Sequence, residues 1–159
     1  MMPRDKVLKK LAEGLVRSGF QGRGRRFTRV WPELAWLFQL ESIPRTARVG
    51  IYVGICPVEL APNGWPARAN DCPIILHPEG GGEPFGLDHW EAWQALDTAS
   101  ELEDAVRLAT LDEIVRSVAE VAERVTTIGE LRRLAADGQL RGFVHRDARA
   151  LLDGDDATP

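Results

Sequence analysis

The sequence predicts an α+β fold, because its helical and alternating segments occupy separate stretches of the chain. One amphipathic segment comes first, alternating segments follow, and the last third is helical. Segregated runs of this kind indicate an antiparallel sheet with helices packed on one face. The 159 residues, 44% of them hydrophobic, fit one domain with its own core and argue against a disordered chain. We therefore expect a single domain over residues 1–159, ordered from about residue 5 to 152, with a frayed tail at 153–159.

The first element is a helix over residues 5–17, because apolar side chains recur there at helical spacing. These side chains are Val7, Leu8, Leu11, Ala12, Leu15 and Val16. Ser18-Gly19 ends the helix, since glycine readily adopts the left-handed conformation that closes one. Phe20 is then placed to fold back onto the helix.

Alternating apolar residues predict an antiparallel meander of three to four strands. After a turn at 21–25, the strands are residues 26–31, 34–41 and 49–56, and a short apolar run at 74–76 adds a fourth. Strand side chains point alternately to the two faces of a sheet. Leu34, Trp36, Phe38 and Leu40 must therefore face the helices together.

The last third of the chain predicts C-terminal helices. Three pairs of residues match the capping box, in which a Ser or Thr precedes a Glu by three positions: Ser100 with Glu103, Thr110 with Glu113, and Thr127 with Glu130. We expect helices at 100–108, 111–125, 128–136 and 146–152, and a short helix or bent segment at 88–96. Three consecutive glycines between prolines predict a mobile surface loop at 77–86.

Charge is distributed unevenly along the chain. Residues 1–31 contain nine basic and two acidic side chains, or +7, and residues 32–159 contain 11 basic and 22 acidic ones, or −11, which together give the net charge of −4. The basic end attracts anionic partners. A sequence pI of about 5.4 nevertheless disfavours a nucleic-acid binder, whose pI typically exceeds ~9.

The composition also bears on the compartment. No apolar run approaches the ~20 residues of a membrane helix, and the charged N-terminus lacks the apolar stretch of a signal peptide. We therefore expect a cytoplasmic protein with no membrane partner. Cys56 and Cys72 form no C-x-x-C pair and are expected to be reduced, although a disulfide between them stays open.

Asp71, Cys72 and His77 are the residues that a small hydrolase or nuclease-like enzyme would use, with Cys72 as the nucleophile. In an extended segment, Cys72 and His77 are an odd number of positions apart and point to opposite faces. This spacing disfavours direct contact, so we assign no catalytic residue. A zinc site of Cys56, Cys72, His77 and His89 lacks the paired ligands of structural zinc, and we expect neither metal nor cofactor.

Arginine and tryptophan side chains are the candidate binding residues. Cationic and aromatic side chains together hold single-stranded nucleic acid, and the arginine-rich hairpin with Trp31 has both. A tryptophan that stays exposed indicates a protein-binding surface, for which Trp65, in a proline-flanked loop, is the best candidate. The full candidate set is Arg23, Arg25, Arg26, Arg29, Trp65, Trp90 and Trp93.

Several short motifs resemble a known family. They are Ser18-Gly19-Phe20, residues 24–29, Trp36-Leu37-Phe38-Gln39, residues 49–54, Asp71-Cys72-Pro73-Ile74 and Trp90-x-x-Trp93. Together, over about residues 6–135, they resemble the bacterial domain-of-unknown-function family 4304. The chain departs from that family in its apolar segment Ile74-Ile75-Leu76 and in its Gly80-Gly81-Gly82 loop. The family has no established activity, so the resemblance implies an α+β fold and a cytoplasmic bacterial setting but no catalytic residue.

The sequence therefore favours a non-enzymatic module that binds an unknown protein partner, such as an immunity-like protein that neutralises a basic toxin. Two alternatives stay open. One is the small hydrolase or nuclease-like enzyme using Asp71, Cys72 and His77. The other is single-stranded nucleic-acid binding by the hairpin from Arg23 to Arg29, which the acidic composition disfavours.

Overall fold

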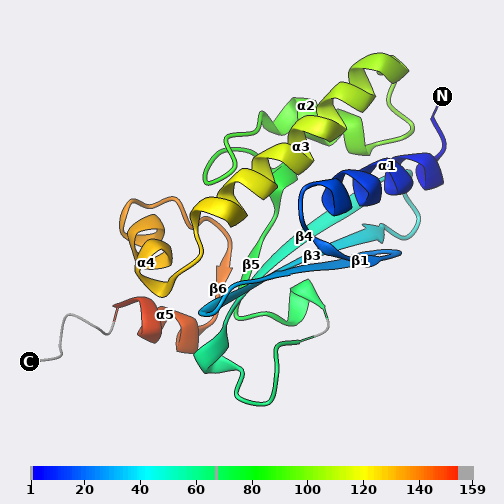
Figure 1. Cartoon of the computed structure of the whole chain (residues 1–159). Coiled ribbons are helices and arrows are strands. Elements are labelled where there is room, and N and C mark those ends of the chain that lie inside the picture. The colour runs from blue at the N-terminus through cyan, green and yellow to red at the C-terminus, as the bar shows by residue number, and fades with distance from the viewer. Residues whose placement is uncertain (1, 67, 154–159) are drawn as a thin grey trace, which may run out of the picture.

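The computed structural model describes residues 2–66 and 68–153 and has the predicted α+β fold (Figure 1). Within these residues, six strands form one antiparallel sheet in chain order. The strands are β1 (Gln21–Arg23), β2 (Arg26–Val30), β3 (Leu34–Ser42), β4 (Val49–Pro57), β5 (Ile74–Leu76) and β6 (Phe143–Val144). The α-helices are α1 (Arg4–Arg17), α2 (His89–Leu96), α3 (Asp104–Arg124), α4 (Ile128–Ala136) and α5 (Arg146–Asp153).

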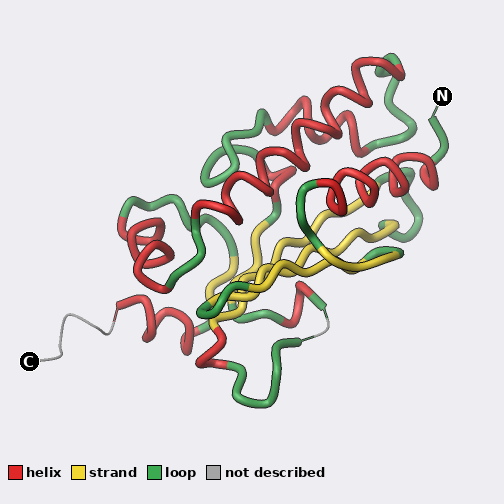
Figure 2. The backbone as a smooth tube through the Cα atoms, in the orientation of Figure 1, coloured by secondary structure: helices red, strands yellow, loops and turns green. Residues whose placement is uncertain are grey.

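The helices and the sheet form two layers. Figure 2 shows α1 and α3 on one side of the sheet, with α4 and α5 at one end of the molecule. The long α3 packs against both α1 and α2. The other sheet face is partly covered by the segment between β4 and β5, where Ala69 and Cys72 form a small second cluster with Leu37 and Cys56. The sheet is thus buried on one face and partly open on the other.

The register of β3 is the one that alternation predicts. Leu34, Trp36, Phe38 and Leu40 are all buried in the main core between sheet and helices. Trp36 is fully buried, and its Nε1 donates a hydrogen bond of 2.9 Å to the carbonyl oxygen of Val125, at the end of α3. A tryptophan inside a core needs such a partner for its N–H. The predicted aromatic face of β3 is therefore the centre of the core.

The end of α1 and the start of α4 lie where the capping residues in the sequence predict them. α1 ends before Gly19, which has a φ of 95°, and the amide of Phe20 donates to the Leu15 carbonyl. The capping box of α4 is formed, since Thr127 accepts a bond from the amide of Glu130 and Glu130 accepts one from the amide of Thr126. Both helix boundaries are confirmed.

The predicted division of the next helical stretch is wrong. The structure has one continuous helix, α3, where the sequence predicts two helices at 100–108 and 111–125. Thr110 lies inside α3 and donates its hydroxyl to the Val106 carbonyl, while Ser100 precedes the helix. The side of α3 that packs on the protein continues past Thr110, from Arg107 and Leu108 before it to Leu111 after it, and this packing outweighs the local start signal.

The sheet has more strands than predicted. β1 lies in the predicted turn at 21–25, of which only residues 24 and 25 form the turn. β1 and the two-residue β6 are short edge strands, and β1 is exposed along its length. Neither has the apolar alternation by which strands are recognised. The predicted surface loop at 77–86 is also packed more tightly than expected, since Phe85 is buried together with Leu87 just after it.

A buried arginine joins α3 to the end of α2, and the sequence gives no sign of it. Arg107 is 1% exposed. Its guanidinium donates to the carbonyl oxygens of Gln94, Ala95, Asp97 and Ser100, and to the Ser100 hydroxyl. The last carbonyls of a helix have no partner within it, so Arg107 caps the C-terminus of α2.

Two further observations complete the fold. Within the described part of the chain, no helix combines the length and the apolar character needed to span a membrane. Most of the tail predicted to be frayed, residues 154–159, lies outside the described residues.

Candidate binding site

The arginines of the β1–β2 hairpin point to different faces of the sheet. Arg29 pairs with Trp36 in the register and therefore faces the helices. There its Nη1 donates 3.0 Å bonds to the Ser18 carbonyl and the Glu123 carboxylate, and its guanidinium lies 4.8 Å from the ring centre of Trp31. Arg29 thus joins β2 to α3 and is not free for a ligand.

Trp31 is also held by the fold. Its Nε1 donates a 3.0 Å hydrogen bond to the carbonyl oxygen of Ala122 in α3. The proposed nucleic-acid site needs this ring to stack on a base, together with Arg29. Both side chains are occupied within the protein, so only the remaining hairpin arginines are available to a partner.

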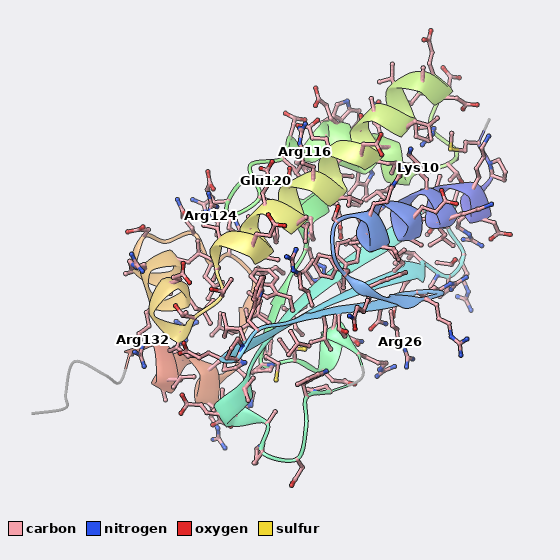
Figure 3. All side chains as sticks on the ribbon, in the orientation of Figure 1. Lys10, Arg26, Arg116, Glu120, Arg124 and Arg132 are labelled. Atoms are coloured by element: carbon pink, nitrogen blue, oxygen red, sulfur yellow. The ribbon has the colours of Figure 1, made fainter. Side chains whose placement is uncertain are left out.

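Arg23, Arg25 and Arg26 are exposed, and none has an ion-pair partner in the described ranges. Arg23 and Arg26 are opposite each other in the hairpin register, on the sheet face away from the helices. Figure 3 shows Arg26 extending from the sheet on the side opposite α1 and α3. These three side chains form an unneutralised basic edge.

An apolar groove lies between α1 and the hairpin, next to this basic edge. We call it the hairpin groove; its volume is about 490 Å³, and it is lined by Ala12, Glu13, Val16, Arg17, Gly22, Arg23, Gly24 and Phe27. Val16 is 52% exposed, although it belongs to the apolar stripe of α1. Gly22 and Gly24 add no side chains to the lining. The groove therefore exposes apolar surface to solvent beside free positive charge.

A second depression, the edge cleft, lies at the other end of the sheet. It has a volume of about 530 Å³ and is lined by residues 60–64, 66, 70–73, 143, 145 and 147 together with Cys56. Phe143 is 54% exposed in this lining, and Trp65, between two lining residues, is 39% exposed. Trp65 is thus exposed as a binding residue requires, but it lies far from the hairpin arginines along the sheet order.

The two cysteines beside the edge cleft are free and buried. Burial raises the pKa of the Cys72 thiol to about 12, with smaller contributions from Cys56 and Asp71. Burial also raises the pKa of Cys56. The nucleophile in cysteine chemistry is the thiolate. At neutral pH Cys72 is a protonated thiol and unsuited to nucleophilic attack.

The structure does not bring Asp71, Cys72 and His77 together. Asp71 is ion-paired to Arg68 at 3.1 Å. His77 lies against the ring of Tyr52, and its Nδ1 is 3.7 Å from the Glu79 carboxylate. The hydrogen bond with Glu79 raises the pKa of His77 against the opposing effect of burial.

The prediction that Cys72 and His77 point to opposite faces of an extended segment is wrong. β5 begins only at Ile74, so Cys72 precedes the strand, and its Sγ lies over Gly54 on the sheet face away from the helices. His77 is on the same face, against Tyr52. The two residues lie over different β4 residues, so no Cys–His pair forms. Among the described residues, no three His, Cys, Asp or Glu side chains are grouped to hold a metal.

The two tryptophans of α2 differ. Trp90 is 64% exposed. Trp93 is half-buried, because the guanidinium of Arg48 stacks 3.2 Å from its ring centre and His89 packs on it. Trp93 therefore stabilises the contact between α2 and the start of β4, and Trp90 stands alone on the surface.

Comparison with known proteins gives no further guide to the site: no family model, curated protein or solved structure matches this chain. The resemblance to the domain-of-unknown-function family 4304 stays a prediction.

Sequence reasoning missed the groove residues Val16, Arg17 and Phe27. The sequence signal for them was the apolar stripe of α1, because the β1–β2 hairpin is too short to cover the whole stripe.

Proposed function

We propose that this protein is a non-enzymatic protein-binding module and that the hairpin groove is its docking face. The observation that carries the proposal is the exposed apolar lining of the groove, with Val16 52% exposed beside the unpaired Arg17 and Arg23. An exposed apolar patch with a polar rim is typical of a protein interaction site.

The state of the candidate catalytic residues supports the non-enzymatic part of the proposal. Cys72 is a buried thiol whose pKa is raised to about 12. Asp71 is committed to Arg68, and His77 contacts Tyr52 and Glu79. The buried, unbridged thiols also support a reducing compartment, and we include a cytoplasmic setting in the proposal.

Site-specific photo-crosslinking in the native host tests the docking face. A photo-reactive phenylalanine analogue replaces Val16 in one variant and Val106, which is 48% exposed on α3, in a matched control. We expect a discrete adduct of higher mass at position 16, because a docked partner covers that side chain, and none at position 106.

Thermal unfolding of both variants at the wild-type temperature is the control for folding. Equal crosslinking at the two positions, or no adduct at either, contradicts the proposal.

A further inference from the structure

We infer that the hairpin groove takes an acidic protein segment that inserts one bulky apolar side chain. The inference rests on the proposed function and names the chemical class of the partner. It combines two features that the structure places side by side, an apolar lining and a group of unpaired arginines.

The apolar part of the groove suits a single large side chain. Its floor is Phe27, which is 1% exposed, and its wall on α1 is Ala12 and Val16. The volume of about 490 Å³ lies within the ~300–1,000 Å³ of sites that bury a ligand. Interfaces obtain most of their binding energy from a few anchors buried in such pockets. A Leu, Ile or Phe side chain of the partner fits this description.

The charged part of the groove favours a negatively charged partner. Arg17 and Arg23 line it, Arg25 follows in the hairpin turn, and Arg26 lies on the sheet face away from the helices. All four are exposed and lack an ion-pair partner among the described residues. The single acidic lining residue, Glu13, is 4.0 Å from Lys9.

Two other cations of the basic N-terminal segment already have acidic partners. Lys10 is 3.3 Å from Asp112, and Arg29 is 3.0 Å from Glu123. Charge complementarity raises association rates and excludes partners of like charge. An acidic segment in the groove is attracted to Arg17 and Arg23, whereas a basic segment is repelled.

A protein segment fits these observations better than single-stranded nucleic acid. Nucleic-acid grooves combine basic residues with aromatic faces on which bases stack. Here Trp31 and Arg29 face α3, and Phe27 forms the floor between them and the groove with only 1% of its surface exposed. Phosphate contacts alone would leave Val16 uncovered.

Selection from a phage-displayed random peptide library, with the purified protein as bait, tests the partner class. We expect the enriched peptides to be acidic and to share one bulky apolar residue. Measured by fluorescence anisotropy, the enriched peptide should bind at least about tenfold more weakly when that residue is replaced by serine. Its affinity should also fall as salt rises.

Two variants and one control locate the binding. The double variant Arg17→Glu with Arg23→Glu, and the single variant Val16→Asp, should each weaken the peptide at least about tenfold. Arg146→Glu, a side chain 91% exposed on α5, should leave the affinity unchanged. All the substituted residues are exposed, and a wild-type unfolding temperature shows that each variant is folded.

The inference is overturned if no peptide is enriched, if the enriched peptides are basic or neutral, or if both groove variants bind normally. If oligodeoxythymidylate binds more tightly than the acidic peptides, the basic edge is a nucleic-acid site and the inference is also overturned. An adduct at position 16 in cells together with any of these outcomes rejects the acidic partner while keeping the protein-binding module. Absence of that adduct rejects the proposed function itself.

Discussion

Replacing Arg107 with methionine tests how the end of α2 is held to α3. The guanidinium donates five hydrogen bonds, at 2.9 Å to Gln94, 2.8 Å to Ala95, 2.9 Å to Asp97, and 3.2 and 3.0 Å to the carbonyl and hydroxyl of Ser100. Methionine keeps the apolar stem and removes every donor. The carbonyls of Ala95 and Asp97 then lose their side-chain donor, whereas Gln94 keeps the bond from the Ser100 hydroxyl.

The size of the effect follows from the burial of each bond. The bond to Ala95 is buried and the other four are part-buried. An orphaned buried acceptor costs about 2 kcal/mol, and a part-buried bond that water replaces costs about 0.5 kcal/mol. We therefore expect Arg107→Met to lower the free energy of unfolding by about 4 kcal/mol, a large share of the ~5–15 kcal/mol of a typical domain.

Urea denaturation followed by tryptophan fluorescence measures this loss. Arg116→Met, on the exposed side of the same helix (Figure 3), is the matched control and should change stability by less than about 0.5 kcal/mol. A loss below about 1 kcal/mol for Arg107→Met, or an equal loss for the control, would refute the capping argument.

Three further outcomes are expected. Trp36→Phe removes the buried N–H that caps the end of α3 and should cost about 3 kcal/mol in urea denaturation; a loss under about 1 kcal/mol contradicts this. The rise of the Cys72 pKa from 9.0 to about 12 lowers its thiolate fraction about a thousandfold. Cys72 and the buried Cys56 should therefore react with a disulfide reagent only after the protein unfolds. Fast labelling of the native protein would contradict this prediction. Because Glu79 raises the His77 pKa above 6.5, the stabilisation from this pair is complete below pH 6.5 and is lost as the pH rises through the raised pKa. Urea midpoints of wild type and His77→Gln should therefore converge as the pH rises above 6.5, and parallel curves would exclude this linkage.

The elements predicted well are those with a regular apolar period. α1 buries one apolar stripe, and β3 and β4 direct alternate large apolar side chains into the main core although their other face is also largely buried, so the period appears in the sequence. β1 was missed because an exposed edge strand has no face to bury, and β6 because two residues carry no period. α3 was divided in two because the start signal at Thr110 is local, whereas the buried stripe that overrides it continues past that residue.

The candidate site was predicted less completely. Sequence alone identifies the arginine-rich hairpin, but the face to which each arginine points depends on the strand register, which turns Arg29 toward α3. Periodicity assigns Val16 to the core, since it belongs to the apolar stripe of α1. The stripe extends beyond the short β1–β2 hairpin that would cover it, and this excess apolar surface forms the groove.

The most direct test of the docking face compares two exposed positions in the same cell culture. A photo-reactive residue at position 16 probes the hairpin groove, and one at position 65 probes the border of the edge cleft, where Trp65 is exposed. We predict a discrete adduct at position 16, abolished by Arg17→Glu with Arg23→Glu, and none at position 65. An adduct at position 65 alone would contradict the account and move the partner to the edge cleft.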